Sequence, residues 1–567
     1  MSSLYGSIRL AANTLRANQI ALQVVGQNIA NANTPGYIRE EVVLTPAPTQ
    51  KHGGLLLGMG VQVTAVVQKL DHFLEQRLRG AVSDQGSTAT LQHTYSQLES
   101  IIGELSDTDL STSMNKFFAA INEVLNQPEN VSVRNLAVLQ GVTLTQDISR
   151  MAARTQELRR DVNNRVANMA SDINRLLEEV RQLNVRIAET EGGNASASDA
   201  VGLRDQRLHA LENLAKLIDI RVIEQPSGGV TIYRGGDYLV FEGTRREVEV
   251  VQSNDRGMTV ANIHLKDTDA ALNPASGELN GLLAARDDVL GAFADDLDAF
   301  ARTFTFEFNK VYTSGQGLNA FDRVTGVYAV DDVDVPLSQA GLAFTPRNGA
   351  FQVMVYNSQT KLTQTTDIQI DLDGLGNNDN TLADLRDMLN AVDGVAAEIT
   401  LDRKLVIASQ AADQQIAFAG DTSGVLAALG VATFFTGTSA RDMGVNADVR
   451  NDPAKFAASK NGVGNDTEIA VELARFMDRP IASRNGASIG GLYERLVAET
   501  TQGATVANAD AAGAEVFEMT LRGQRLATSG VNLDEEAIKM LAYQHSFTAS
   551  ARFIATVNEL FGLLVGI

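Results

Sequence analysis

Apolar residues in the N-terminal segment recur in alternating steps of four and three. The spacing is followed by Leu4, Ile8, Ala11, Leu15, Leu22, Val25 and Ile29, with Asn18 as its one polar member. The C-terminal segment repeats the design, with apolar residues seven apart at Leu533, Met540, Phe547, Ile554 and Phe561, and with Leu564 beside them. Heptad spacing predicts helices that bury one stripe against a partner helix. We therefore expect the two segments to pair as a coiled coil.

Both segments are poor in charge on their other faces as well. The first 38 residues hold only Arg9 and Arg16, and beyond Glu536 the only charges are Lys539, Arg552 and Glu559. Helices that face water usually carry a charged outer surface. Two interpretations remain open: helices packed on several sides by neighbouring copies, or one helical hairpin with a neutral surface.

A turn motif follows the first stripe. Its residues include Asn31, Asn33, Thr34, Pro35, Gly36 and Tyr37. Pro followed by Gly is a strong turn signal, so the motif should end the first helix and start an extended stretch. Physical reasoning alone supports a helix stop and nothing more.

The middle of the chain alternates between helical and strand patterns. Helical spacing predicts helices over 90–126, 132–191, 199–219 and 276–311, and again from 467 with a break near 485–491. At about 1.5 Å per residue the second of these would be roughly 80–90 Å long, which is typical of an elongated molecule. Period-two spacing over 220–265 predicts a hairpin around Gly235-Gly236. Strands are expected at 351–356 and 367–372 and a hairpin across 399–407, with a helix over 382–391.

These patterns predict a multidomain, mainly helical α+β protein. The terminal helices pair as a coiled coil, and an elongated helical bundle carries an inserted β-rich α+β domain. The expected domains are a coiled coil from 1–75 and 525–567, a helical bundle from 76–220, 276–320 and 465–524, a small β-hairpin segment at 221–275, and an outer insertion at 321–464.

Composition excludes several classes of function. The net charge of −22 argues against nucleic-acid binding, which needs a basic face. The chain has no Cys, so disulfides, thiolate metal sites and Cys nucleophiles are excluded. No apolar stretch approaches the ~18 residues of a membrane span, and we expect no secretory signal peptide, so secretion would need another export route.

No catalytic, cofactor or metal constellation emerges. The six His form no zinc motif. The acidic loop 371–379 resembles a calcium loop only faintly, because Leu375 takes a ligand position and Leu382 replaces the bidentate Glu. We interpret it as a polar turn before a helix that Thr381 would cap. The expectation is a structural protein with no cofactor, no metal and no enzymatic activity.

Assembly motifs are more specific. Ser2-Ser3-Leu4 and the run from Asn28 to Tyr37 resemble the N-terminal signature of bacterial flagellar rod, hook and hook-associated proteins. Further stretches are similar to the junction family of hook-associated proteins: Ser529–Glu536, Tyr543-Gln544, Ala551–Phe561, Gly53–Val61, Asp71–Leu78, Leu203–Arg207 and Gly281–Asp287. The resemblance covers roughly 1–320 and 465–567 and is weak across 321–460.

The resemblance implies a role at the junction of hook and filament, outside the cell. It implies that the coiled coil forms an inner axial domain of a tube, and that the protein leaves the cell unfolded through the flagellar type III export apparatus without a cleaved signal peptide. The implied partners are further copies of the chain, the hook protein, hook-associated protein 3 and an export chaperone on the C-terminal helix; neither nucleic acid nor membrane insertion is implied.

The hypothesis for the mechanism is coupled folding and assembly of the terminal helices. The expected assembly residues are Leu4, Ile8, Leu15, Leu22, Ile29, Asn31, Asn33, Thr34, Pro35, Gly36, Tyr37, Leu533, Met540, Phe547, Ile554, Phe561 and Leu564. Alternatives are a hook or distal rod protein, which shares the turn motif, or a scaffold with an adhesive or enzymatic outer domain.

Overall fold

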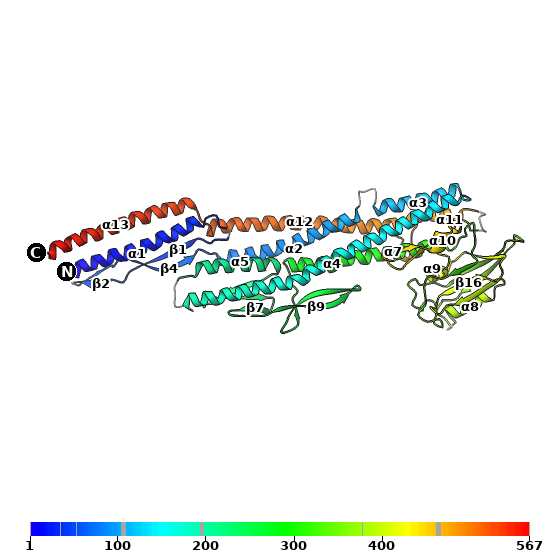
Figure 1. Cartoon of the computed structure of the whole chain (residues 1–567), viewed down its shortest axis with the longest axis horizontal. Helices are drawn as coiled ribbons and strands as arrows, with labels where there is room; N and C mark the ends of the chain where they lie inside the picture. The colour runs from blue at the N-terminus through cyan, green and yellow to red at the C-terminus, as the bar shows by residue number, and fades with distance from the viewer. Residues whose placement is uncertain are drawn as a thin grey trace. The chain divides into compact units, whose positions relative to one another are not determined.

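The computed structural model describes residues 2–34, 36–52, 54–103, 109–192, 198–376, 378–460 and 466–565 (Figure 1). The chain divides into two compact units. Unit 1 comprises Met1–Thr94, Asp161–Arg286 and Val506–Ile567, and unit 2 comprises Tyr95–Arg160 and Asp287–Thr505. Three long helices contribute to both units: α2 (His72–Ile102), α4 (Val131–Thr190) and α12 (Ile489–Ser529).

The terminal helices of unit 1 lie side by side, as the heptad stripes predict. α1 (Ser2–Ala30) packs antiparallel against α13 (Leu533–Val565) (Figure 1). A second side of α1 is covered by an antiparallel pair of strands, β1 (Glu40–Pro46) and β4 (Val61–Gln68). The strands β2 (Gln50–His52) and β3 (Leu55–Leu57) form a smaller antiparallel pair between them in sequence.

Helix α2 begins earlier than its sequence pattern predicts. The pattern indicated one helix over 90–126, whereas α2 starts at His72 and a separate helix, α3 (Leu110–Asn126), follows a break. The Asp71 carboxylate accepts the N–H groups of Phe73 and Leu74 and so caps the first turn of α2. Gly103, at a φ of +61°, ends the helix, because a left-handed residue cannot continue it.

The small sheets of unit 1 are antiparallel and are held to α4 by asparagines. Strands β5 (Arg221–Glu224), β6 (Val230–Arg234), β7 (Asp237–Phe241) and β8 (Thr244–Arg245) form one sheet, and β9 (Val248–Asp255), β10 (Met258–Leu265) and β11 (Ala270–Ala271) form another. The β6–β7 pair confirms the predicted hairpin. Asn174 and Asn184 each accept a backbone N–H and donate to a backbone C=O of a strand, at Val248 and Val230 respectively.

Unit 2 has a helical part whose core is aromatic. Here α3 packs with α11 (Glu468–Ala474), which also packs with α7 (Leu290–Tyr312). The helices α5 (Val201–Leu217) and α6 (Glu278–Ala284) belong to unit 1 instead. The buried rings that stack or meet edge to face are those of Phe117, Phe304, Phe308, Phe434, Phe435 and Phe476. Such ring pairs add to the free energy gained by burying their apolar area.

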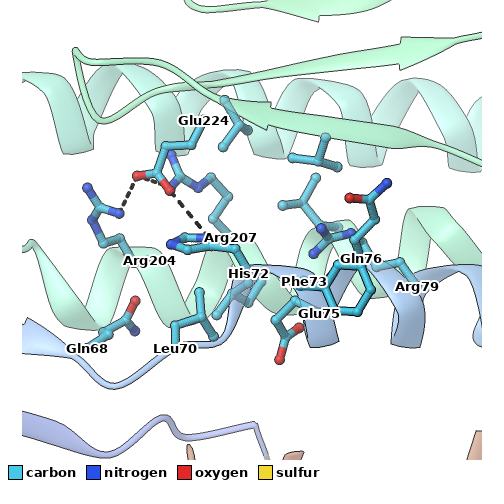
Figure 2. A pocket seen from close by; sticks show the side chains of 14 residues that line it. Gln68, Leu70, His72, Phe73, Glu75, Gln76, Arg79, Arg204, Arg207 and Glu224 are labelled. Atoms are coloured by element: carbon cyan, nitrogen blue, oxygen red, sulfur yellow. Dashed lines mark hydrogen bonds and ion pairs between the residues drawn. The ribbon is translucent and has the colours of Figure 1, made fainter. Parts of the chain in front are cut away.

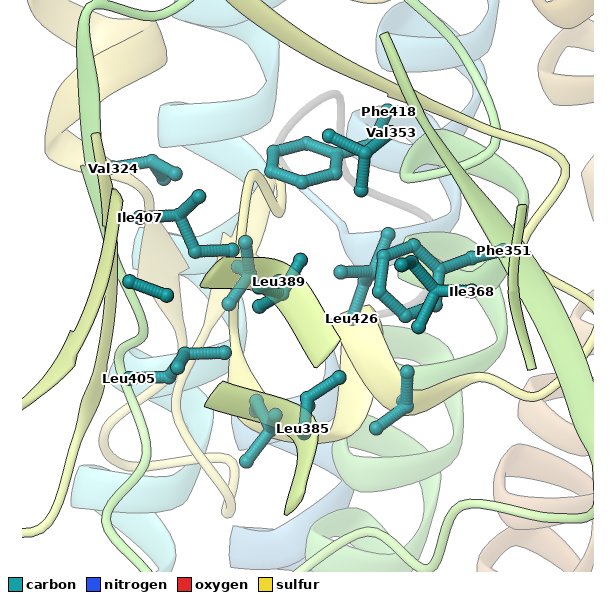
Figure 3. Close-up of a cluster of buried hydrophobic side chains, with 14 of the residues drawn as sticks. Val324, Phe351, Val353, Ile368, Leu385, Leu389, Leu405, Ile407, Phe418 and Leu426 are labelled. Carbon is teal, nitrogen blue, oxygen red and sulfur yellow. The ribbon is translucent and has the colours of Figure 1, made fainter. Parts of the chain in front are cut away.

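The predicted α+β insertion is the second part of unit 2. One sheet contains β13 (Gly349–Asn357), β14 (Thr363–Ile370) and β17 (Gln414–Ala419), and the other contains β12 (Arg323–Thr325), β15 (Val395–Ile399) and β16 (Leu405–Ser409). Their side chains and those of α8 (Leu382–Asn390) and α9 (Val425–Leu429) share one apolar core (Figure 3). Thr381 and Asp384 form a capping box at α8, which confirms the predicted cap.

The mainly helical fold with small antiparallel sheets is the predicted class. Within the described residues, no helix is both long enough and apolar enough to cross a membrane.

Candidate assembly interface

The buried face of α1 is rotated from the predicted stripe but shares Ala11, Asn18 and Val25 with it. Ile8, Leu15, Leu22 and Ile29 are partly buried, whereas the residues buried most deeply are Ala11, Ala17, Asn18, Ala21, Val24, Val25 and Asn28. The rotation follows from the second layer, because α1 is covered by the β1–β4 pair as well as by α13. The side chains of Leu4 and Leu564 and all of Pro35 lie outside the described residues.

The predicted stripe of α13 is also only partly buried. Met540, Phe547, Ile554 and Phe561 are partly buried, and Leu533 at the start of the helix is about half exposed. The ring of Phe561 meets Tyr5 edge to face, with centroids 5.5 Å apart. Asn18, the polar break in the heptads, donates from Nδ2 to Ser546 Oγ at 2.8 Å. A polar residue in a seam specifies alignment, because only one pairing satisfies its hydrogen bond.

A second apolar face of α13 points away from α1. It consists of Ile538, Leu541, Phe553, Leu560 and Leu563, which are 44–68 % exposed, and we call it the outer apolar face. At 3.6 residues per turn these side chains lie opposite Glu536, Phe547 and Ile554. Large apolar side chains that recur along one exposed side of a helix are typical of an interaction site in a folded protein. This favours the interpretation in which neighbouring molecules pack on the terminal helices.

The β2–β3 pair also exposes leucines. Leu55, Leu56 and Leu57 are consecutive and all exposed, although successive side chains of a strand point to opposite faces. The pair therefore buries neither of its faces within unit 1.

A buried polar cluster joins the start of α13 to the chain after the turn motif. Arg39 forms hydrogen bonds from Nε and Nη2 to Oε1 of Glu536, whose side chain is fully buried. Asn28 donates to Oε2 of the same carboxylate at 3.0 Å and accepts the phenolic O–H of Tyr37 at 2.9 Å. The paired donors hold the pKa of Glu536 below its usual range although burial opposes this. The cluster fixes where the two terminal helices start to pair.

The turn motif itself is tightly constrained. The side-chain amide of Asn31 donates to the carbonyl of Gln27, and Thr34 Oγ1 donates to Asn31 Oδ1, while Asn33 is exposed. Gly36 has a φ of +78°, and a Cβ there would overlap the imidazole of His209 on α5. Only glycine suits this position, because a side chain would be strained and would clash. The turn borders a cavity of about 390 Å³ whose lining also includes Arg522 and Arg525 of α12.

Two carboxyl groups lie close together behind the turn. Burial, with the nearby Glu40 carboxylate as a second cause, raises the pKa of Asp205 to about 7. Burial also raises the pKa of Glu40, against a hydrogen bond with Tyr37 that lowers it. The joint between the terminal pair and α5 therefore contains a group that titrates near neutral pH.

Sequence reasoning missed Asn28, Arg39 and Glu536 as parts of the site. All three carry a weak signal in the sequence. Asn28 opens the N-terminal motif, Glu536 closes the C-terminal motif, and Arg39 is the first charge after a long charge-poor segment. Nothing in one sequence indicates that an Arg and a Glu 497 positions apart meet in the fold.

The acidic loop after β14 brings carboxylates together. Asp371, Asp373 and Asp379 each place an oxygen within 4.8 Å of the others, the only such group among the residues that the structure describes. The loop is stabilised internally, since Asn378 donates to Asp371 and Gly374 donates to Asp379. Acidic turns of this type are common on protein surfaces, and no other observation indicates an ion here.

Comparisons with known proteins assign the class. Residues 8–37 match the family described as flagella basal body rod protein, and residues 522–566 match the C-terminal family of flagellar basal body rod FlgEFG proteins. Residues 95–324 match the helical domain of flagellar hook-associated protein FlgK. The terminal matches coincide with the paired helices α1 and α13, so the chain is an axial structural protein of the bacterial flagellum.

Full-length relatives identify the family. Flagellar hook-associated protein 1 of Salmonella typhimurium is 25 % identical over 606 residues and that of Escherichia coli K12 is 26 % identical over 591, each with complete coverage of both chains. The chain belongs to the family of hook-associated protein 1, FlgK, and is a structural component of the hook–filament junction, outside the cell. This confirms the prediction of a structural, non-enzymatic protein.

Two further comparisons match only part of this chain. The protein of the same name from Bacillus subtilis is 26 % identical over 367 residues, which is 58 % of this chain and 72 % of its own. A solved structure of the flagellar hook junction protein FlgK from Burkholderia pseudomallei has a TM-score of 0.48 and 16 % identity, and the match covers 80 % of this chain and all of that one.

Proposed function

We propose that the chain builds its part of the junction by burying the outer apolar face of α13 and the exposed leucines of β2–β3 against neighbouring copies. The observation that carries the proposal is the second apolar face on a helix whose first face is already occupied by α1. A single molecule leaves this surface in water, whereas heterologous contacts between copies bury it and propagate as a helical tube.

We assign different roles to the assembly residues according to how deeply they are buried. Ile8, Leu15, Leu22 and Ile29 of α1, with Met540, Phe547, Ile554 and Phe561 of α13, hold the two helices of one molecule together. In the sequence, the heptad spacing continues through Leu533, Leu4 and Leu564. The turn residues Asn31 to Tyr37 set the direction in which the chain leaves α1, so they act by positioning rather than by contact.

The partners proposed for the assembled chain are those that the family resemblance implies. They are the hook protein on one side, hook-associated protein 3 on the other, and, before export through the type III apparatus, a chaperone that covers α13. The outer apolar face supports this last proposal, because an exposed apolar helix in the cytoplasm would otherwise promote aggregation. In the assembled tube the domain from 1–75 and 525–567 would line the axis, with the bundle and the 321–464 insertion farther out.

A complementation experiment tests the proposal. Cells that lack this gene should complete hooks, make no filaments and shed flagellin into the medium. Wild-type protein and Leu362→Glu, a charge placed on an exposed leucine of unit 2, should restore filaments, whereas Leu541→Glu on the outer apolar face should not. Truncated hooks in the deletion strain would move the protein down the axis to the rod or hook. Normal filaments with Leu541→Glu would refute the proposed contact.

A further inference from the structure

A cavity of about 400 Å³ lies in unit 1 between the start of α2, helix α5 and strands β5 and β6 (Figure 2). Its volume is in the range of small-molecule binding sites. The apolar part of its wall is formed by Leu70, Phe73, Leu208, Leu211, Val222 and Val230. The rest of the wall is polar or charged, so the cavity is neither a packing void nor a purely apolar groove.

The charged part of the wall contains three arginines and two glutamates. Glu224 is already neutralised, since Arg204 forms a close ion pair with it and Arg207 lies 3.8 Å away. Glu75 is likewise paired, with its Oε1 3.2 Å from Nε of Arg525. Figure 2 shows Arg204, Arg207 and His72 gathered around Glu224. Both acidic groups of the wall therefore have a cationic partner other than Arg79, although Arg525 is shared between Glu75 and Glu212.

Arg79 is the exception among these charges. Its side chain lines the cavity and stands apart from the group around Glu224 (Figure 2), and the residue is only 9 % exposed. Among the described residues, its guanidinium takes part in none of the ion pairs that hold the other charges of the wall. Burial lowers the pKa of this group, and the Glu75 carboxylate one turn away opposes that only in part.

A buried arginine without an ion-pair partner lacks an anion to balance its charge. A guanidinium stays charged at any physiological pH and offers five N–H donors in a planar fork. Removing such a charge from water is unfavourable unless an anion and acceptors replace the water. Water in the cavity would accept hydrogen bonds but would not neutralise the charge. A carboxylate does both, and its two coplanar oxygens match two parallel N–H donors of the planar fork.

We propose that this cavity is a binding site for a carboxylate, which Arg79 holds with two parallel N–H donors. The apolar wall formed by Leu208 and Leu211 takes the carbon chain that carries the carboxylate. The carboxylate comes either from a small dicarboxylic acid in solution or from an Asp or Glu side chain of a second copy, and the chemistry at Arg79 is the same. This activity is separate from the apolar contacts of the terminal helices.

Calorimetric titration of the full-length chain with succinate tests the first source. The wild type should bind saturably, and Arg79→Met should bind at least tenfold more weakly. Arg77→Met is the matched control, because Arg77 is exposed and lies over the rings of Phe73 and Phe517 rather than in the cavity wall. Arg79→Lys keeps the charge without the fork and should also lose affinity, which covers the case in which Arg79→Met fails to fold.

Sedimentation velocity without added carboxylate tests the second source. Association of the wild type that rises with concentration and is lost in Arg79→Met, but not in Arg77→Met, would assign the carboxylate to another copy. Either succinate binding or this association, if it depends on Arg79, supports the proposal. Neither one in the wild type, or equal affinity in the wild type, Arg79→Met and Arg79→Lys, overturns it. Failure here leaves the proposed junction contacts of α13 untouched, because those are tested by filament growth.

Discussion

The Nη2 atom of Arg39 lies 2.6 Å from Oε1 of Glu536, although the two residues are 497 positions apart. Glu536 has no exposed side-chain surface, and Asn28 satisfies its second oxygen. Arg39 also contacts Glu535, at 2.9 Å from Nη1, but that glutamate is 57 % exposed. Two adjacent acids of α13 therefore share one arginine in very different environments, and this makes them a matched pair for experiment.

Glu536→Gln should weaken the attachment of α13 by about 3 kcal/mol, because it leaves the Arg39 charge buried without its closest partner. Glu535→Gln removes an exposed partner and should cost below about 1 kcal/mol. Amide hydrogen exchange in α1 and α13 measures the difference, with faster exchange expected only in the first variant. Equal exchange in the two variants would mean that burial does not decide the strength of this contact.

Lowering the pH from 8 to 5 should stabilise unit 1 through Asp205. Its pKa in the folded chain is raised to about 7, so between about pH 4 and 7 the folded state binds more protons than the unfolded state. The free energy of unfolding therefore falls as pH rises through this window. Solvent screening of this partly exposed group limits the gain to about 1–2 kcal/mol.

The variant Asp205→Asn isolates that effect from the other titrating groups. It should be more stable than the wild type at pH 8, and the advantage should shrink by pH 5, as measured by urea unfolding at both values. A stability difference that does not change with pH would show that the carboxyl keeps its ordinary pKa.

Leu22→Glu should disrupt the pairing of the terminal helices. Leu22 is partly buried, and a carboxylate there loses hydration without gaining a partner, at a cost on the order of 2–3 kcal/mol. We expect no filaments in cells and rapid amide exchange in α1, while unit 2 keeps its protection. Gln23→Glu, one position away on the exposed side, should leave the exchange of α1 in the monomer unchanged. Normal filaments with Leu22→Glu would contradict the proposed role of the helix pair.

Gly36→Ala should destabilise unit 1 by about 1–3 kcal/mol, since it adds a Cβ to a left-handed residue that touches His209. Gly6→Ala is the control: its Cβ would have open space within α1, so it should stabilise by up to about 1 kcal/mol. Thermal unfolding separates the two signs. A second change, His209→Ala, should relieve the clash in Gly36→Ala but not the backbone strain, so rescue should be partial.

Local sequence patterns predicted most of the elements. The hairpin at Gly235-Gly236 and the helix capped by Thr381 depend on residues within a few positions of each other, and both are present. The start of α2 was missed because its apolar residues, Leu74 and Leu78, are few and belong to a helix with a weak stripe; they are buried by Leu521 of α12, far away in sequence. At the start of α2, packing against a distant helix provides the stability that the weak local apolar pattern does not indicate.

Residue spacing along the chain was enough to predict that its two ends form helices with apolar stripes, and that the Pro-Gly turn ends the first of them. Tertiary structure alone decided which sides of those helices are buried, because β1 and β4 cover α1 from a second direction. It also decided that Asn18 faces Ser546 and that Arg39 meets Glu536. Periodicity along a helix records that a face is apolar, whereas the identity of its partner depends on where distant segments come to lie.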